Sequence, residues 1–490
     1  MCGIFIVVNR LNDVIYNPKS IQHRGPDDTK VYKTDNIEFH FYRLSINDVS
    51  QDGSQPFISS KSVLVCNGQI YNHHEIPGKV KGNSDCEKLL PLFDTYGFIE
   101  GVRKIDGVFA TGYYDYINKN LYVARDPVGI RPLFYGHYKD SIIFSSEMKA
   151  IPSEYSCNIF PPGHIYDHST QNFHCYFPLY WNVNYNHTYP PEIKKLLIDA
   201  VTKRVTNSDR QLGFFLSGGL DSSLIAAIGS QILGKITTFS IGTDRNSPDL
   251  IYARKVSEHL NTKHYEILFD PLQAFDMIPE IIKAIETSDI TTIRASTPMY
   301  ILSKWIKKNT NIKVLLSGEG SDEIFGGYLY FHKAPNEIEF HNETVRLVQK
   351  LHQYDVLRAD RCTAAHGLEI RVPFLDLELL NSVMSLSTNY KFPINKIEKY
   401  TLRHLFSDNN WLPDDVLWRQ KNAFSDAVGY NWVDLVKSKM IQIGTNEETY
   451  YKEIFMKYYE NRENNIPDIW RPKWTKEKDP SARNLEEFKG

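Results

Sequence analysis

The chain has no uninterrupted apolar run long enough to cross a bilayer, which takes about 20 residues as a helix. It also has no excess of charge of either sign, because 56 Lys and Arg stand against 59 Asp and Glu. We therefore expect no membrane partner and no nucleic-acid partner. Cysteine is scarce and shows no paired spacing, with thiols at positions 2, 66, 86, 157, 175 and 362. Neither a zinc site nor a disulfide framework is predicted, and a reducing cytoplasm fits this pattern.

The 490 residues predict at least two domains. Short β-rich runs bounded by Asn, Asp and Gly dominate up to about residue 175. The aromatic and Pro-rich stretch 176–191 is interpreted as a linker that packs on the rest of the protein. From about 192, short apolar strands alternate with helices, which indicates a parallel sheet, and after about 330 the chain is largely helical. We predict domains at 2–180 and 192–490.

The chain is organised around the stretch Gln211–Ser223, in which an apolar run stops at Ser217, two glycines follow and a helix begins. Gly218 and Gly219 allow backbone N–H groups to approach an anion, toward which the helix points its positive end. Asp221 does not suit an anion site unless a cation is also bound there. A Mg²⁺ ion between carboxylate and phosphate resolves this, so the stretch predicts a pyrophosphate site with a metal.

A second strand and Gly-rich loop, Leu315–Gly327, carries Glu319 and Asp322. Asp322 and Asp221 are expected to share the Mg²⁺, and Glu319 is a candidate to accept a proton from an attacking ammonium. Lys421 is a candidate for stabilising charge near the α-phosphate of ATP. Adenine is expected at the sheet edge near Ser240–Gly242.

The N-terminus carries a candidate nucleophile. Removal of Met1 would leave Cys2 as the first residue, with its own α-amine as the base for the thiol. On Cys2 alone, a buried strand cysteine is the favoured interpretation. Its surroundings change this, because Arg43 suits a substrate carboxylate and Asp85 an α-ammonium, while the Asn67 amide and the Gly68 N–H suit an oxyanion. Together they predict attack on the side-chain amide of an amino acid.

Several motifs resemble those of the glutamine-hydrolysing asparagine synthetases. In the first half they are Cys2-Gly-Ile-Phe, His23-Arg-Gly-Pro-Asp, Arg43-Leu-Ser-Ile, Asn67-Gly-Gln-Ile-Tyr-Asn, Ser84-Asp-Cys-Glu and Ala124-Arg-Asp-Pro-Val-Gly. In the second half they are Ser217–Ser223, Thr291-Thr-Ile-Arg-Ala-Ser-Thr-Pro, Ser317-Gly-Glu-Gly-Ser-Asp-Glu, Arg371-Val-Pro-Phe-Leu-Asp, Trp418–Asp426 and the tail segments Trp470–Trp474 and Asp479–Arg483. The resemblance covers nearly the whole chain.

The resemblance implies an α+β N-terminal-nucleophile αββα sandwich, that of a class II glutamine amidotransferase. An α/β parallel-sheet ATP-pyrophosphatase-like domain with a helical C-terminal part follows. It implies synthesis of asparagine from aspartate, ATP and glutamine through β-aspartyl-AMP, with ammonia passing through an internal tunnel. A homodimer is left open. The catalytic residues implied are Cys2, Asn67, Gly68, Glu319 and Lys421.

The resemblance also implies the binding residues. For glutamine these are Arg43, Leu44, Ser45, Ile46, Asn47, Asn67, Gly68, Gln69 and Asp85. For ATP they are Leu216, Ser217, Gly218, Gly219, Asp221, Ser222, Ser223, Ile241, Ser317 and Gly318. Thr291 and Arg294 would bind aspartate, and Asp221 and Asp322 the metal.

One position departs from the family, which usually has Glu where Gln69 stands. A neutral side chain there predicts weaker glutamine binding, with the site kept active by Asp85. The ion pairs of His23–Asp27 and Arg125-Asp126 are interpreted as fixing loops rather than as catalytic groups.

Two other functions stay open from the sequence. One is a related amide-forming enzyme with another acyl substrate, of the β-lactam synthetase type. Cys2 and the Thr-Thr-Ile-Arg segment at Thr291–Arg294 count against it. The other is a glutaminase-only relic, for which Gln69 is the only support.

Overall fold

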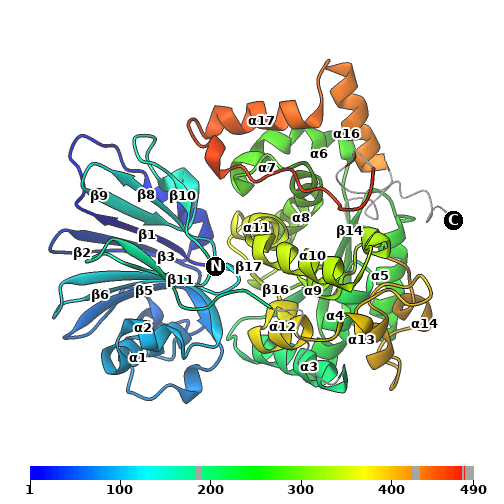
Figure 1. Ribbon diagram of the computed structural model, residues 1–490, viewed down its shortest axis with the longest axis horizontal. Helices are drawn as coiled ribbons and strands as arrows, with labels where there is room; N and C mark the ends of the chain where they lie inside the picture. Colours follow the sequence, from blue (N-terminus) through cyan, green and yellow to red (C-terminus); the bar gives the residue numbers. More distant parts are fainter. Residues whose placement is uncertain (182–189, 422–430, 477–478, 480–490) are drawn as a thin grey trace.

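The structure is a computed structural model that describes residues 1–181, 190–421, 431–476 and 479. It has two lobes that contact each other over a broad face (Figure 1). The first lobe is built from two antiparallel sheets and the second from a parallel sheet covered by helices. This confirms the predicted fold class.

The first sheet of the N-terminal lobe begins with the first residues of the chain. Its strands, in spatial order, are β10 (Asn158–Ile159), β8 (Phe134–Tyr138), β9 (Ser141–Ser145), β1 (Gly3–Val8), β3 (Ile37–Arg43) and β2 (Asp28–Thr34). β1 is central, paired with β3 from Gly3 opposite Tyr42 and with β9 on its other edge. All six of its residues are buried, which explains why it is apolar without alternation.

The second sheet packs face to face on the first. Its strands are β12 (Asn172–Cys175), β11 (His164–Asp167), β7 (Asn120–Arg125), β6 (Gly107–Asp115), β5 (Ser62–Ile70) and β4 (Phe57–Ile58). Ile4, Ile6, Val63 and Val65 meet in the core between the sheets. Helices α1 (Leu89–Tyr96) and α2 (Phe98–Val102) cover the outer face of this sheet (Figure 1). The other outer layer is thinner, with the 3₁₀ helices η1 (Pro18–Arg24) and η5 (Met148–Ala150).

The sheet of the C-terminal lobe is entirely parallel. Its order is β15 (Lys263–Leu268), β14 (Thr237–Gly242), β13 (Leu212–Phe215), β16 (Val314–Leu316) and β17 (Glu369–Arg371). The chain runs outward from β13 to β15 and then returns to β16 on the other side of β13. Right-handed crossovers therefore place α4 (Leu220–Leu233) and α5 (Pro248–His259) on one face and α8 (Ile290–Asn309) on the other.

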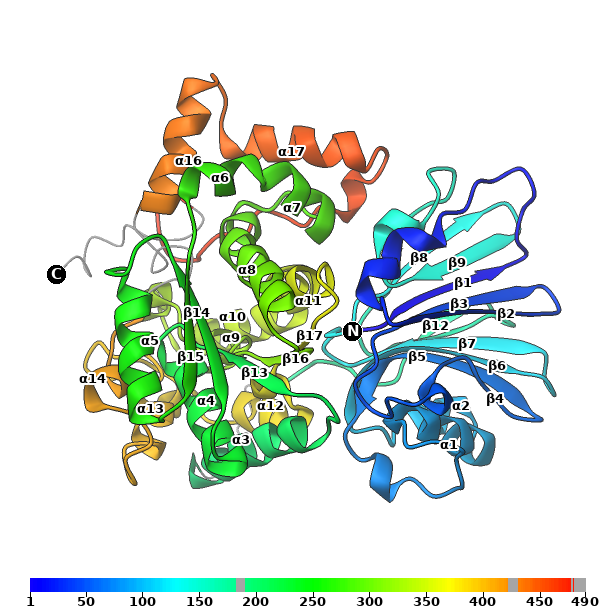
Figure 2. The ribbon, with the colours of Figure 1, turned by 180° about the vertical axis from the view of Figure 1, so that it is seen from behind.

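The remaining helices surround this sheet (Figure 2). They are α3 (Pro190–Thr206), α6 (Pro271–Asp276), α7 (Ile278–Ile285), α9 (Ser321–Phe325), α10 (Glu337–Lys350), α11 (Asp355–Ala364), α12 (Leu377–Met384), α13 (Tyr400–Leu405), α14 (Asp414–Leu417), α16 (Asn431–Gln442) and α17 (Glu447–Tyr458). The helical character after residue 330 is as predicted, except that β17 is a strand. Within the described ranges, no helix has the length and apolar character to cross a membrane.

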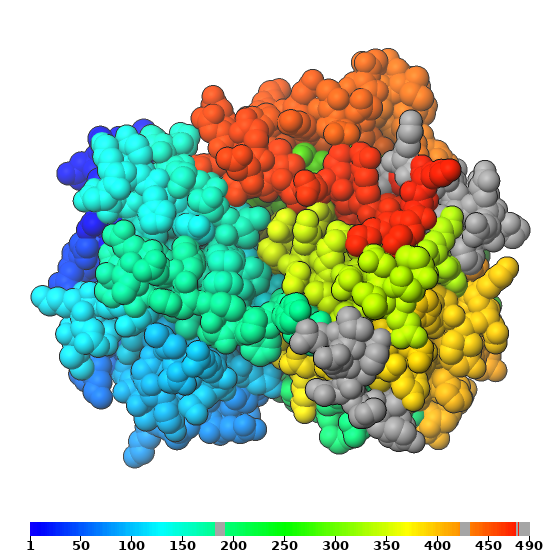
Figure 3. Space-filling model, in the orientation of Figure 1, coloured from blue at the N-terminus to red at the C-terminus, as the bar shows by residue number. Residues whose placement is uncertain are grey.

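The described end of the linker packs against the C-terminal lobe, as predicted. Trp181 donates from Nε1 to Asn381 Oδ1 at 3.1 Å, and its carbonyl oxygen contacts His341 Nε2 at 3.0 Å. Gln349 Nε2 donates to the Leu179 carbonyl at 2.8 Å. In the space-filling view the two lobes form one continuous surface along this side (Figure 3). The middle of the linker lies outside the described residues.

Candidate functional site

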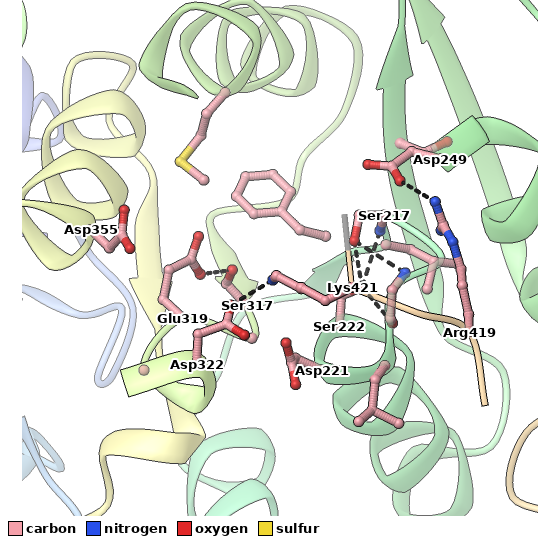
Figure 4. A pocket seen from close by; sticks show the side chains of 18 of the residues that line it. Ser217, Asp221, Ser222, Asp249, Ser317, Glu319, Asp322, Asp355, Arg419 and Lys421 are labelled. Carbon is pink, nitrogen blue, oxygen red and sulfur yellow. Dashed lines mark hydrogen bonds and ion pairs between the residues drawn. The ribbon is translucent and has the colours of Figure 1, made fainter. Parts of the chain in front are cut away.

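A cavity opens at the carboxyl ends of β13 and β16, where the strand order reverses. Ligands of open α/β sheets bind at such a reversal, because the loops on its two sides lead away in opposite directions. The loop after β13 is Ser217–Gly219 and the loop after β16 is Ser317–Gly320. Both predicted Gly-rich loops therefore face one cavity (Figure 4).

The loop after β13 is stabilised by its own serines. Ser217 Oγ lies 3.0 Å from Ser222 Oγ, and it accepts from the Gly219 N–H at 3.3 Å. Gly218 has φ +69°, and a Cβ there would lie 2.4 Å from the Ala253 nitrogen. Glycine is thus required at Gly218 both by the backbone conformation and by the close approach of α5.

The two predicted metal ligands, Asp221 and Asp322, both line this cavity and lie near each other (Figure 4), and Lys399 pairs with both. Lys399 Nζ is 2.7 Å from Asp221 Oδ2 and 2.6 Å from Asp322 Oδ1. Lys421 Nζ donates to Asp322 Oδ2 at 2.5 Å. Burial works to raise the pKa of Asp322, but the two lysines hold it below its usual value. Lys399 was not among the predicted residues.

These carboxylates suit Mg²⁺ bound together with phosphates. Mg²⁺ in nucleotide sites typically takes one or two carboxylates and completes its shell with phosphate oxygens and water. Among the residues described, there is no cluster of three or more His, Cys, Asp or Glu that would hold a metal without a ligand. Asp221 and Asp322 would therefore hold the ion only when the nucleotide supplies further oxygens.

The end of the cavity that holds Glu319 and Asp355 is acidic (Figure 4), and Arg358 also lines the cavity. Arg358, on α11, lies 3.4 Å from Glu319 Oε1 and also pairs with Asp355. Glu319 Oε2 accepts a short hydrogen bond from Ser317 Oγ. Burial, with Asp355 and Asp322 nearby, raises the pKa of Glu323 well above its usual value. This end offers both a cation and carboxylates to a small zwitterion.

The opposite side of the cavity holds an ion pair between Arg419 and Asp249, which the sequence did not predict. Arg419 Nη2 donates to Asp249 Oδ1 at 3.2 Å, and its Nη1 donates to the Gly218 carbonyl at the same distance. The guanidinium lies 4.1 Å from the centre of the Tyr252 ring. Burial raises the pKa of Asp249 to about 7, although Arg419 opposes the shift. Arg419 thus connects the segment that carries Lys421 to the pyrophosphate loop.

The cavity wall includes most of the residues predicted for ATP. Those that line it are Leu216, Ser217, Gly219, Asp221, Ser222, Ile241, Ser317 and Gly318, together with the predicted catalytic residues Glu319 and Lys421. Gly218 and Ser223 do not line it, since Gly218 faces α5 and Ser223 is fully buried on α4.

Thr291 and Arg294, predicted to bind aspartate, are not in the cavity wall. Arg294 is buried and makes a bidentate ion pair with Glu447 of α17, with a Nε–Oε1 distance of 2.9 Å. It also donates to Asp479 at 2.9 Å. Thr291 Oγ1 donates to Asp289 Oδ2 at 2.7 Å. Met299, further along α8, lines the cavity. Arg294 is about 7.5 Å from Met299 along the axis of this helix, on the side of its N-terminus.

The second predicted site lies in the N-terminal lobe, around Cys2. The Leu44 N–H donates to Cys2 Sγ at 3.4 Å, which places the Arg43–Asn47 segment directly beside the thiol. Burial raises the pKa of the Cys2 thiol, and the N-terminal ammonium and Arg43 act in the opposite direction. Met1 is 1% exposed and its sulfur contacts Arg131 Nη1 at 2.6 Å, so the methionine fills the space next to the nucleophile.

Asn67 is the predicted oxyanion donor. The residue is 1% exposed, and its Nδ2 has no hydrogen-bond partner among the residues that the structure describes. A buried amide without a partner costs free energy, and such groups mark ligand sites when a ligand can complete them. Gly68 follows on β5, where a Cβ would lie 2.6 Å from the Val108 carbonyl. The pair lies on the strand that packs against β1, which follows Cys2.

The predicted carboxylate and ammonium binders have protein partners. Arg43 donates from Nη1 to the Ser50 carbonyl at 2.6 Å and, by a shorter bond, to the Asp48 carbonyl. Asp85 Oδ2 accepts from the Ile70 N–H at 2.7 Å, and burial raises the pKa of this carboxyl. Both side chains are buried and fixed in place around the predicted glutamine site.

The predicted loop-fixing residues hold loops, and one of them joins the lobes. Arg125 donates to three backbone carbonyls, those of Gly129, Arg131 and Phe160. Arg24 donates to the Cys2 carbonyl at 3.0 Å and pairs with Glu147 and with Asp360 of α11.

Family models match both parts of the chain. The model described as glutamine amidotransferase domain matches residues 1–208, and the one described as asparagine synthase matches 192–341 and 333–485. The chain belongs to the asparagine synthase family.

Named relatives of this family extend over the full length. An enzyme of Oryza sativa named asparagine synthetase [glutamine-hydrolyzing] 2 is 38% identical, covering 99% of this chain and 92% of its own length. A probable asparagine synthetase of Dictyostelium discoideum is also 38% identical, covering 99% and 98%. A solved glutamine PRPP amidotransferase from B. subtilis aligns at 17% identity with TM-score 0.30, over 50% of this chain and 67% of its own.

Proposed function

We infer that this protein is a ligase that makes asparagine from aspartate and ATP, with glutamine as the nitrogen donor. The observation that carries this function is the presence of two different candidate sites in one chain. One combines Cys2, whose thiol contacts Leu44, with the buried Asn67 amide, which has no partner among the described residues, and the other has a Gly-loop cavity with two carboxylates and two lysines. A glutaminase alone would not need the second site.

In the first half-reaction Cys2 attacks the side-chain carbonyl of glutamine, once Met1 is removed. The α-amine of Cys2 takes the thiol proton and delivers it to the leaving ammonia. Asn67 Nδ2 and the Gly68 N–H stabilise the oxyanion, a contribution that typically amounts to about 10²–10³ in rate for each donor. Water then hydrolyses the thioester to glutamate.

In the second half-reaction the β-carboxylate of aspartate attacks the α-phosphorus of ATP, and pyrophosphate leaves. Lys421 and Lys399, both held by Asp322, are cations of the cavity that would stabilise the negative charge developing on the phosphates. Ammonia then attacks the β-carbonyl of the aspartyl adenylate and AMP leaves. Glu319 would accept a proton from the attacking nitrogen. When bound, Mg²⁺ would neutralise the pyrophosphate between Asp221 and Asp322.

The aspartate position has two candidate sets of residues. The predicted pair is Thr291 and Arg294, and Arg294 would need to exchange Glu447 or Asp479 for the substrate carboxylate. The lining offers Arg358 instead, with Asp355 and Glu323 for the ammonium. We favour Arg358 as the carboxylate contact, because it faces the cavity directly beside Glu319.

The decisive experiment is a product assay. Purified protein with aspartate, ATP and Mg²⁺ is expected to release asparagine, AMP and pyrophosphate with either glutamine or ammonia. A β-lactam synthetase-like enzyme would consume ATP with a larger β-amino acid and not with aspartate. A glutaminase relic would release glutamate without ATP turnover. Absence of AMP formation with aspartate would overturn the proposed function.

The domain boundaries, the cellular location and the oligomeric state are also proposals. We propose the domain boundaries 2–180 and 192–490 and a cytoplasmic location, the latter supported by six free cysteines. A homodimer is testable by light scattering of the purified chain.

A further inference from the structure

Gln69 lies on β5, two residues after Asn67, at the contact between the two lobes. Its side chain is 4% exposed. Its Oε1 accepts from Asn47 Nδ2 at 3.2 Å and from Asn207 Nδ2 at 3.4 Å, and its Nε2 donates to Glu369 Oε2 at 3.5 Å. Asn47 belongs to the N-terminal lobe, whereas Asn207 and Glu369 belong to the C-terminal one. One amide therefore bridges both lobes.

The two groups on the C-terminal side are fixed. Arg371 donates from Nε to Glu369 Oε1 at 2.8 Å and from Nη1 to the Asn207 carbonyl at 2.8 Å. Burial tends to raise the pKa of Glu369, but Arg371 and Arg131 lower it below its usual value, so the group is ionised. Because a carboxylate can only accept, the NH₂ of Gln69 must face Glu369 and its oxygen must face the asparagines.

On the other side, the neighbours of Gln69 are parts of the glutamine site. Gly68, the residue before it, is a predicted oxyanion donor. The N–H of Ile70, the residue after it, holds Asp85 Oδ2 at 2.7 Å. Asn47 ends the Arg43–Asn47 segment, which contacts the Cys2 thiol through Leu44. A shift of residue 69 would thus displace groups on both sides of the bound substrate.

We propose that Gln69 is a positioning residue that couples the glutamine site to the docked C-terminal lobe through Asn207 and Glu369. This rests on the proposed function and assigns Gln69 a role other than direct binding of the substrate ammonium. The amide is the side chain that suits this place. A carboxylate at position 69 would face the ionised Glu369, and an apolar side chain would leave Asn47, Asn207 and Glu369 without this partner.

The test compares Gln69→Glu, Gln69→Leu and the exchange variant Gln69→Glu/Glu369→Gln, with Gln171→Glu at an exposed turn as the matched control. Each is assayed for the glutamine KM, for the ratio of glutamate to asparagine produced, and for synthesis with ammonia. For both single variants we expect the KM and the ratio to rise roughly tenfold, while ammonia-dependent synthesis stays within about twofold of the original. The exchange variant restores one amide facing one carboxylate and is expected to recover most of the coupling.

Two outcomes would overturn the proposal. One is a Gln69→Glu or Gln69→Leu enzyme whose glutamine KM and product ratio match those of the unmodified protein. The other is an exchange variant that keeps ammonia-dependent synthesis and is no better coupled than Gln69→Glu. If the unmodified protein makes no asparagine from ammonia, the proposed function fails, and that result is separate from either outcome.

Discussion

At the scale of single residues, the two candidate sites hold buried polar groups in opposite states. Asn67 Nδ2 is buried and has no hydrogen-bond partner in the described part of the chain, although most buried amides are satisfied. Lys399 shows the reverse case, a buried cation fully paired by Asp221 and Asp322. A bound substrate would accept a hydrogen bond from the Asn67 amide. In the other site, a bound substrate would compete with Lys399 for the carboxylates of Asp221 and Asp322.

Replacement of Cys2 by Ala separates the two half-reactions. We expect glutamine-dependent synthesis to fall by roughly a thousandfold or more, since the nucleophile is lost, while ammonia-dependent synthesis stays intact. Asparagine formation with each nitrogen donor is the measurement. Cys175→Ala, at an exposed thiol, is the control. If Cys2→Ala lost both activities, the two-site description would be wrong.

The arginine that binds aspartate can be identified by two variants. We expect Arg358→Ala to raise the KM for aspartate by roughly tenfold or more, because a charge-assisted contact with the substrate is removed. Arg294→Ala is expected to change the KM less and to lower the thermal stability, because it leaves Glu447 buried without its bidentate partner. Steady-state kinetics and thermal unfolding of both variants decide this. The opposite pattern would assign aspartate to Arg294.

At the scale of secondary-structure elements, function depends on strand ends. β13 and β16 are paired neighbours, so the Gly-rich loops that follow them converge on one cavity although they are far apart in the sequence. α5 packs under the first loop, and Arg419 fastens the Lys421 segment to it through Gly218 and Asp249. The nucleotide half of the cavity is thus built from three short connections.

The Asp249–Arg419 contact predicts a pH dependence of ATP activation. The pKa of Asp249 is raised to about 7, so the carboxyl is ionised above that pH and protonated below it. As the pH falls from 8 to 6, the ion pair weakens, and we expect ATP–pyrophosphate exchange to decline with it. Asp249→Asn should show a lower and flatter profile over this range. A variant with the original slope would exclude Asp249 as the source.

At the scale of the whole molecule, buried charges join the lobes. Arg24 and Glu147 of the N-terminal lobe meet Asp360 and Arg361 of α11, with Arg24 also holding the Cys2 carbonyl. Such a network contributes little net stability when complete, but loss of one member leaves unpaired charge in a dry interface. It therefore fixes how the lobes dock.

Removal of Asp360 is predicted to destabilise the protein as a whole. Asp360→Ala should cost about 3–5 kcal/mol, because it leaves Arg24 without its bidentate carboxylate partner. Denaturant unfolding compared with Asp270→Ala, a helix cap outside the interface, measures this. Asp360→Asn is expected to lose less, and a wild-type midpoint for Asp360→Ala would contradict the role given to the network.

The sequence predicted the family and both kinds of sheet correctly, because the motifs and strand patterns are local. The same holds for the loop Ser217–Ser222, whose geometry is set by its own glycines and serines. Lys399 and Asp249 were missed, since a single charged residue carries no local sign of what it will face. β17 was missed because three residues with charged ends have no strand pattern. The partners of Arg294 come from residues more than 150 positions away.

Met1 is buried at the contact between the two lobes. Its amine is fully enclosed, and burial lowers the pKa of that amine to about 5. Arg131, which contacts its sulfur, also donates to the Ile370 carbonyl of the C-terminal lobe at 3.4 Å, so the two lobes close over the first residue together. An aminopeptidase needs that residue free. The removal of Met1 proposed above would therefore have to precede docking of the second lobe. A molecule whose lobes dock with Met1 in place is expected to make asparagine from ammonia but not from glutamine.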